Sequence, residues 1–233
     1  MMTDARSTSS VVRFGLLLAC LSLVYVCFAS PSDQMAASKE DRKVLTPLGA
    51  IKVTYFGPRM APTSFIAIHG MALAMNQEWF GVAEYLSKSL HVRVAVPDFH
   101  SNPATSPRAI GSEDFMRILK ALLPPSGDVI MLGKSWGGAA VARFAASYPQ
   151  LIRAVVLDAP ALPASEIATT CTTWQSPLLL LWARDDPVVP QSRASVWQNR
   201  CPHASAHFVD VGGHTIITQV YKEPILNFVR SLV

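Results

Sequence analysis

One short motif in the sequence has the residue types and spacing for covalent chemistry at a serine. Residues 133–137 are GKSWG, a G-x-S-x-G pattern, and they lie between the apolar run Val129–Leu132 and a helical pattern of small residues. A serine on so tight a turn adopts strained backbone dihedrals, and flanking glycines let the strand and the helix approach without a Cβ clash. The motif therefore predicts Ser135 as a nucleophile, with Gly133 and Gly137 shaping the turn.

A serine hydroxyl needs a base to remove its proton, and the base needs an acid to orient it. Where a G-x-S-x-G serine has these partners, they follow it in the order acid, then histidine. His214 follows the apolar run Ala206–Val211 and two glycines, so it lies on a loop at the carboxyl edge of the predicted sheet. We expect His214 to be the base. The alternative is a loop histidine with a structural role alone.

Three aspartates compete for the role of the orienting acid. Asp185 and Asp186 follow the apolar strand pattern LLLLW in the segment ARDDPVVP, and Asp158 ends the strand pattern VVLD. We favour Asp186, because it precedes a proline-rich turn that would direct its carboxylate back across the sheet. Asp185 is expected to cap this turn or to lie in solvent, and Asp158 stays a third candidate.

The negative charge that develops during acyl transfer needs backbone N–H donors. Trp136 follows the serine at the N-terminus of the predicted helix, so its amide is one candidate. The second is the amide of Met71, in the loop after the early strand pattern Ser64–His69. His69 is expected to hold this loop rather than to act as a base. This chemistry implies no metal and no organic cofactor.

The elements that must position these residues form one α/β domain, expected over residues 44–233. Short runs that are apolar on both faces alternate with helical patterns, which is typical of a doubly wound, mostly parallel sheet with helices on both faces. Predicted strands are Ile51–Phe56, Ser64–His69, Val92–Pro97, Val129–Leu132, Ala154–Leu157, Leu178–Trp182 and Ala206–Val211. Predicted helices are Glu78–Leu90, Ser112–Leu123, Trp136–Tyr148, Gln191–Asn199 and a terminal helix that includes Pro224.

Composition limits the classes of protein to consider. Half of the residues are hydrophobic and 15% are charged, which indicates a well-filled core rather than disorder. The net charge of +4 is spread along the chain, with no basic cluster interleaved with aromatic residues. We therefore expect no nucleic-acid partner.

The N-terminal thirty residues have a composition of their own. A polar stretch precedes the uncharged run 14–29, which is shorter than the roughly 20 residues that span a membrane. We expect residues 1–30 to be either a signal peptide cleaved after Ala29 or an uncleaved signal anchor that places 14–29 in the membrane. Residues 31–43 are expected to be a flexible linker. Both alternatives send the domain into the secretory pathway, secreted or membrane-anchored.

Two cysteines fall within the expected domain. Cys171 and Cys201 each precede a predicted parallel strand, on the same edge of the sheet. In an oxidising lumen they could form a disulfide. Two buried free thiols are the alternative.

Several motifs together resemble the α/β-hydrolase superfamily across nearly all of residues 44–233. They are IHGM, GKSWGG, ARDDPVVP, GGH and YKEPILNFVRSL. The spacings are 51 positions from Ser135 to Asp186 (186 − 135) and 28 from Asp186 to His214 (214 − 186). Residues 159–177 leave no room for the helical lid that many relatives insert there. In size, spacing and lack of a lid, the chain is similar to the small abhydrolase-domain-fourteen group.

The resemblance implies a serine hydrolase with a Ser135–Asp186–His214 triad and a small-molecule acyl substrate: an ester, a thioester or an acyl-amide. The group has been linked to ester hydrolysis and to removal of acetyl groups from lysine. One segment departs from the superfamily, because PDFHSNP at 97–103 replaces the common D-x-P-G-x-G-x-S. This change bears on substrate specificity. His100 in that segment could contact substrate or be an exposed loop histidine.

Two other functions fit the same fold. A catalytically silent, membrane-tethered domain could act as a binding module, although such domains normally lose a triad residue or an elbow glycine. A peptidase is possible, although the predicted lack of a cap leaves no evident site for a peptide N-terminus. The sequence leaves the acyl group, the leaving group and the oligomeric state open.

Overall fold

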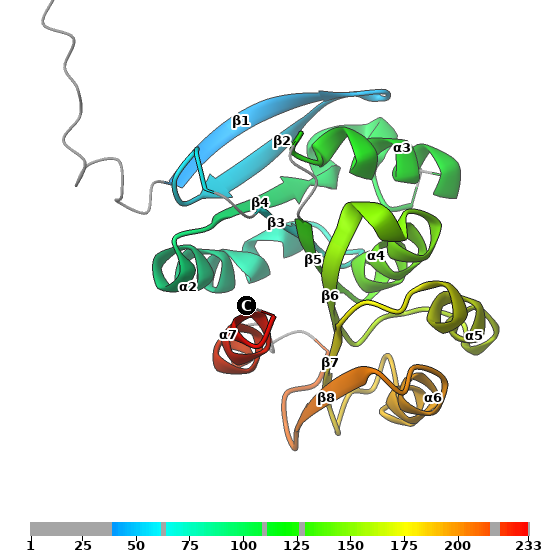
Figure 1. Cartoon of the computed structure of the whole chain (residues 1–233). Helices are drawn as coiled ribbons and strands as arrows, with labels where there is room; N and C mark the ends of the chain where they lie inside the picture. Colours follow the sequence, from blue (N-terminus) through cyan, green and yellow to red (C-terminus); the bar gives the residue numbers. More distant parts are fainter. Residues whose placement is uncertain (1–38, 62–63, 109–110, 126–128, 215–219, 233) are drawn as a thin grey trace, which may run out of the picture.

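The computed structural model describes residues 39–61, 64–108, 111–125, 129–214 and 220–232, which form one eight-stranded sheet flanked by helices (Figure 1). Its strand order is β1-β2-β4-β3-β5-β6-β7-β8. The strands are β1 (Lys39–Thr46), β2 (Gly49–Phe56), β3 (Ser64–Ile68), β4 (Arg93–Asp98), β5 (Val129–Lys134), β6 (Ile152–Asp158), β7 (Leu178–Ala183) and β8 (Ala204–Val209). Strands β3 to β8 are parallel, whereas β2 runs antiparallel to both β1 and β4.

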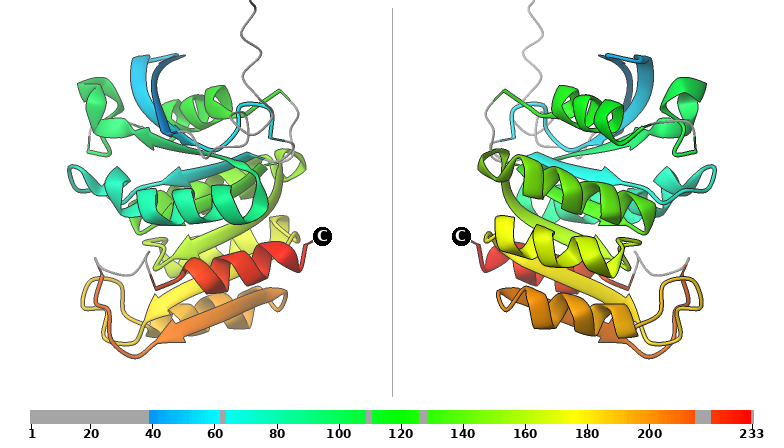
Figure 2. Two further views of the ribbon diagram at one scale, coloured as in Figure 1. Left: turned by 90° about the vertical axis from the view of Figure 1, so that its left-hand side faces the viewer. Right: turned by 90° about the vertical axis from the view of Figure 1, so that its right-hand side faces the viewer.

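Helices cover both faces of this sheet, as the sequence predicted. The α-helices are α2 (Phe80–Leu90), α3 (Ser112–Leu122), α4 (Trp136–Ser147), α5 (Ala164–Thr173), α6 (Ser192–Arg200) and α7 (Lys222–Arg230). Short 3-10 turns are η1 (Met75–Trp79), η2 (Phe99–Ser101), η3 (Pro103–Thr105) and η4 (Pro149–Leu151). Figure 2 shows α2 and α7 in front of the sheet in one view, and α4, α5 and α6 in front of it in the other.

Two hydrophobic cores hold these layers together, one on each face of the sheet. One core joins β-strand side chains to α2 and α7, and the other joins the alternate side chains to α3, α4, α5 and α6. Strands β5 and β7 are buried at every residue, because both of their faces are covered. The central strands thereby provide a rigid platform for the loops at their carboxyl ends.

The sheet begins earlier than the sequence predicted. Strand β1 starts at Lys39, within the segment 31–43 that was expected to be a linker, so the predicted boundary at residue 44 is wrong. The sequence KEDRKVLT gives no apolar run, because β1 is an edge strand held by polar pairs with β2. Lys52 contacts Asp41 at 2.9 Å, and Thr54 donates to the same carboxylate at 2.7 Å.

The segment 159–177 contains helix α5, which the sequence analysis did not predict. Its sequence is rich in threonine, which weakens the apolar periodicity of a helix. Buried Ile167 and Cys171 nevertheless place α5 in the same core as α4 and α6. Helix α5 is thus part of the layer over the sheet, and between β6 and β7 the chain has no inserted lid.

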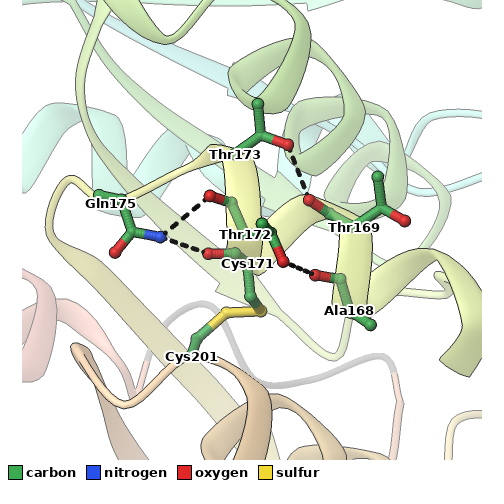
Figure 3. The surroundings of a disulfide bond; sticks show 7 residues. All are labelled: Ala168, Thr169, Cys171, Thr172, Thr173, Gln175 and Cys201. Carbon is green, nitrogen blue, oxygen red and sulfur yellow. Dashed lines mark hydrogen bonds between the residues drawn. A yellow bond between two sulfur atoms is a disulfide. The ribbon is translucent and has the colours of Figure 1, made fainter.

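Cys171 and Cys201 form a disulfide between α5 and the end of α6 (Figure 3). Their Cα atoms are 5.0 Å apart, and both residues are buried. Of the two alternatives left by the sequence, the structure has the disulfide.

The predicted signal segment lies outside the described residues, the first of which is Lys39. Within the part of the chain that is described, no helix has the length and apolar character needed to cross a membrane.

Candidate active site

Ser135 occupies a sharp turn between β5 and α4, as the motif predicted. Its backbone has φ 52° and ψ −117°, a conformation that costs free energy for any residue other than glycine. The Ser135 N–H donates to the Asp158 carbonyl at 2.9 Å, and the Ser135 carbonyl accepts from Ala139 at 3.0 Å. These backbone bonds tie the turn to β6 on one side and to α4 on the other.

The two motif glycines are required by close backbone contacts. A Cβ added to Gly133 would come within 2.6 Å of the Gly137 carbonyl oxygen. A Cβ added to Gly137 would come within 2.6 Å of the Ile68 carbonyl oxygen, at the end of β3. Both contacts are shorter than any real Cβ allows, so the turn closes only with glycine at each position.

His214 lies between the serine hydroxyl and one carboxylate. Its Nε2 is 2.9 Å from Ser135 Oγ, and its Nδ1 is 2.8 Å from Asp186 Oδ2. A carboxylate accepts only, so the neutral ring carries its proton on Nδ1 and presents a lone pair on Nε2 to the serine. The His214 side chain is 11% exposed and the Asp186 side chain is fully buried.

The carboxylate of Asp186 is held by the turn that follows it. Its Oδ1 accepts from the amides of Val188, at 2.8 Å, and Val189, at 2.9 Å, which leaves Oδ2 for His214. Trp182 Nε1 donates to the Val189 carbonyl at 2.8 Å and fixes the same turn from β7. The proline-rich segment thus holds this carboxylate against the His214 ring.

Asp185 points in a different direction and holds the loop that carries the histidine. Its Oδ1 accepts from the amides of Gly212, at 2.9 Å, and Gly213, at 2.8 Å. This role differs from the sequence prediction, in which Asp185 caps its own turn or lies in solvent. The only sequence signal for it is the pair of glycines before His214, because such residues leave backbone amides open to a carboxylate.

Two histidines organise the loop after β3, where Met71 lies. His69 Nε2 accepts from the Phe99 amide at 3.1 Å, so its Nδ1 carries the proton and donates to the Gly70 carbonyl at 2.6 Å. Burial lowers the pKa of His69 to about 4, so it stays neutral and structural, as predicted. His100 Nε2 lies 3.0 Å from the Met71 carbonyl oxygen, so the ring braces this loop.

The two predicted oxyanion donors come from different segments, the start of α4 and the loop after β3. Trp136 begins α4 directly after Ser135, where helix N–H groups lack partners within the helix. Met71 is half exposed on the loop after β3. Trp79 Nε1 donates to the Ile68 carbonyl at 3.1 Å and fixes the start of that loop. The roles of the Met71 and Trp136 amides in stabilising an oxyanion stay predictions.

A buried group of charged residues lies beneath the site, on the α2 face of the sheet. Lys134 is fully buried, and its Nζ contacts Glu78 Oε2 at 2.9 Å. Asp158 pairs with Lys134 in the register of β5 and β6 and is also fully buried. Within the described residues, neither carboxylate oxygen of Asp158 has a hydrogen-bond partner. Burial raises the pKa of Asp158 to about 7, although Lys134 opposes this shift.

Asp158 therefore holds a proton in the folded state below about pH 7, whereas Asp186 occupies the position next to the histidine. The structure brings Ser135, His214 and Asp186 together and gives Asp158 a separate environment. Among the described residues, no group of three or more His, Cys, Asp or Glu side chains is arranged to hold a metal ion.

The chain was compared with protein-family models and with solved structures, and both comparisons identify the same fold. A family model described as the alpha/beta hydrolase fold matches residues 63–170. A predicted CIB-like hydrolase from Thermoplasma acidophilum superposes with a TM-score of 0.74 over 84% of this chain and 99% of its own, at 15% identity. The chain has the α/β-hydrolase fold. A search of curated proteins found no significant match.

Other solved structures share this fold, and one of those described next is named an esterase. Est1E from Butyrivibrio proteoclasticus has a TM-score of 0.68 at 13% identity, over 82% of this chain and 98% of its own. The naproxen esterase of Bacillus subtilis has a TM-score of 0.68 at 14% identity, over 84% of this chain and 93% of its own. At these identities the similarity shows the α/β-hydrolase fold alone.

Proposed function

We propose that this α/β-hydrolase-fold protein is a serine hydrolase that cleaves a carboxylic ester, a thioester or an acyl-amide through an acyl-enzyme on Ser135. The observation that carries the proposal is the continuous hydrogen-bonded chain from Ser135 Oγ through His214 to Asp186, with distances of 2.9 and 2.8 Å. The strained turn at Ser135 adds support, because strain of this kind concentrates at functional sites.

In the proposed acylation step, Ser135 Oγ bonds to the substrate carbonyl carbon while His214 Nε2 takes the hydroxyl proton. The amides of Met71 and Trp136 donate to the oxygen that becomes negative. Collapse of the tetrahedral intermediate breaks the bond to the leaving group, which departs with the proton from His214. Asp186 keeps the imidazole in the required tautomer and stabilises its positive charge.

In the proposed deacylation step, His214 removes a proton from water, and the resulting hydroxide attacks the acyl carbon on Ser135. The acid product leaves as Ser135 Oγ recovers its proton from His214. The cycle balances without any further reactant, and the residues end in their starting protonation states.

The lack of an inserted lid between β6 and β7 supports small acyl groups, or larger ones that protrude into solvent. Helix α5 packs in the layer with α4 and α6, and no inserted lid covers the serine from the segment 159–177. If the sequence resemblance to the small lidless abhydrolase-domain-fourteen group holds, the reaction is ester hydrolysis or removal of acetyl groups from lysine. Est1E, with the same fold, binds ferulic acid in one structure, so an aromatic ester belongs in the panel.

The test is hydrolysis of 4-nitrophenyl acetate, an acetyl thioester, methyl ferulate and an acetyl-lysine peptide by the whole chain and two variants. We expect turnover of at least one substrate, and its loss by at least ~10⁴-fold in Ser135→Ala. Ser147→Ala changes an exposed serine at the end of α4 and should keep full activity. Activity that persists in Ser135→Ala would place the nucleophile elsewhere. A wild-type chain inert toward every substrate would favour a silent binding domain.

We further propose that the domain works in the secretory pathway. The Cys171–Cys201 disulfide supports this location, because disulfides persist mainly in oxidising compartments. The mass of the mature chain distinguishes cleavage after Ala29 from an anchor that keeps residues 14–29. Recovery of the full chain from the cytosol with both thiols reduced would contradict the proposal.

A further inference from the structure

Three arginines surround a cavity at the amino edge of the sheet, the edge opposite to the serine. Arg93 begins β4, Arg42 lies on β1, and Arg59 follows β2. The cavity has a volume of about 500 Å³, and we call it the arginine cavity. The described residues that line it include no Asp or Glu, and its main lining residues are Arg42, Arg59, Arg93, Tyr55, Leu123 and Pro124.

One carboxylate, beside the cavity, pairs with all three guanidinium groups. The carboxylate oxygens of Glu40 lie 2.8 Å from Arg42 Nε, 2.6 Å from Arg59 Nη2 and 3.6 Å from Arg93 Nη2. Hydrogen bonds from Arg42 and Arg59 lower the pKa of Glu40 to about 2, so it is ionised. Three positive charges against one negative charge leave a net charge of +2 at this cluster.

Arg93 is the member whose charge is least compensated. Its side chain is 12% exposed and lies over the Tyr55 ring, 4.3 Å from the centroid. Its Nη1 is buried and has no hydrogen-bond partner among the described residues. Burial, and then repulsion by Arg42, lower the pKa of Arg93. An unpaired buried donor is unfavourable. An anion bound beside the exposed part of the guanidinium would offset the uncompensated positive charge of Arg93.

We propose that the arginine cavity binds a phosphate group, held by Arg42, Arg59 and Arg93 beside Tyr55. The planar guanidinium fork matches the oxygens of a phosphate, and the net charge of the cluster matches a dianion. The site lies far from the catalytic chemistry, because Arg93 starts a parallel strand and Ser135 follows the end of one. The proposal does not rely on the proposed hydrolase activity.

Two sources could present such a phosphate: a free phosphate compound or the headgroup of an anionic lipid. The topology favours the lipid source, since the domain starts at the same edge. Lys39 pairs with Phe56 in the β1–β2 register, and Phe56 pairs with Val94, the residue after Arg93. The chain thus enters the domain beside the cavity, shortly after the predicted signal or anchor segment at 14–29.

The test measures thermal unfolding of the whole chain during titration with inorganic phosphate or with soluble dihexanoyl phosphatidic acid. Sodium chloride at matched ionic strength and dihexanoyl phosphatidylcholine are the blanks. Arg42→Gln/Arg59→Gln removes two exposed members of the cluster, and Arg59→Gln alone is a milder variant. Arg117→Gln/Lys88→Gln removes two exposed positive charges elsewhere and is the matched control.

We expect a saturable rise in melting temperature for the wild type and for the matched control. The apparent affinity should fall by at least about tenfold in Arg42→Gln/Arg59→Gln and by a smaller factor in Arg59→Gln. A response to inorganic phosphate identifies a free phosphate compound as sufficient, and a response to phosphatidic acid alone identifies the lipid headgroup. The proposal is wrong if neither ligand gives a saturable rise, or if the double cavity variant responds like the wild type.

Discussion

Adjacent aspartates after the end of β7 perform two separate tasks at the site. Asp186 contacts the His214 ring, and Asp185 holds the backbone of the glycines before it. One residue therefore sets the orientation of the imidazole and the other sets the position of the loop that carries it. The division follows from the direction of each side chain on a tight turn, where successive residues point to different sides.

The buried carboxyl of Asp158 should make stability depend on pH. Its pKa is raised from 3.8 to about 7 by burial, so between these values the folded state keeps a proton that the unfolded state has released. Stability from this group is greatest at low pH, falls as pH rises through this window, and is lowest above about pH 7. Each pKa unit corresponds to about 1.4 kcal/mol.

Asp158→Asn imitates the protonated form at every pH. We expect its unfolding free energy to exceed that of the wild type by ~4 kcal/mol at pH 8 and to approach it near pH 4. Urea denaturation at the two pH values provides the measurement. An equal loss of stability at both values would show that the ionised form of Asp158 is the one the fold requires.

Sequence reasoning located Ser135, His214 and Asp186, because each lies next to a strong local pattern: a glycine motif, a strand end or a proline-rich turn. It missed the bond from Asp185 to the Gly212 and Gly213 amides, which joins segments 27 and 28 positions apart. It also missed the Lys134–Glu78 pair, which depends on the packing of η1 over β5. Contacts that depend on three-dimensional packing leave no local pattern.

At the scale of elements, the turn between β5 and α4 depends on direct backbone contact among three segments: the end of β5, the start of α4 and the end of β3. Helix α4 starts against the end of β3, so positions 133 and 137 have room for the hydrogen atom of glycine but not for a Cβ atom. The apolar central strands and this turn were predictable, since both follow from local composition. Strand β1 and helix α5 were not, because β1 is charged and α5 is rich in threonine, and tertiary contacts determine both.

Gly137→Ala should disrupt the turn that positions the serine. The added Cβ would lie 2.6 Å from the Ile68 carbonyl oxygen, and backbone atoms cannot move aside as a flexible side chain can. We expect a loss of ~3 kcal/mol or more in unfolding free energy, since overpacking is costly where neighbours cannot relax.

Gly111→Ala is the matched control, because a Cβ at Gly111 meets no atom within 4 Å. The Gly111→Ala variant should lose less than about 1 kcal/mol of unfolding free energy. Denaturant unfolding of both variants makes the comparison. Equal stability of Gly137→Ala and Gly111→Ala would mean that α4 can move away from β3.

At the scale of the molecule, the two edges of the sheet carry different features. The carboxyl edge carries Ser135, His214 and Asp186, whereas the amino edge carries the arginine cavity and the start of the domain. On one face of the sheet, the disulfide joins α5 to the end of α6 and closes a loop with a sequence separation of 30. A cross-link of this span stabilises the fold chiefly by restricting the unfolded chain.

The variant Cys171→Ser/Cys201→Ser should lose ~3–4 kcal/mol of unfolding free energy relative to the oxidised wild type. Its unfolding should not respond to a reducing agent, whereas that of the wild type should. Calorimetry with and without reductant makes both comparisons. If reductant leaves the melting temperature of the wild type unchanged, the disulfide contributes nothing to stability.

The most direct test of the central claim is the site of covalent modification by a fluorophosphonate, which reacts with a serine only when a base has activated it. Peptide mass spectrometry of the labelled whole chain should place the phosphonate on Ser135. Labelling should be absent in Ser135→Ala and strongly slowed in His214→Asn, with near-native circular dichroism in both. A phosphonate on any other residue, or equal labelling of wild type and His214→Asn, would contradict the account.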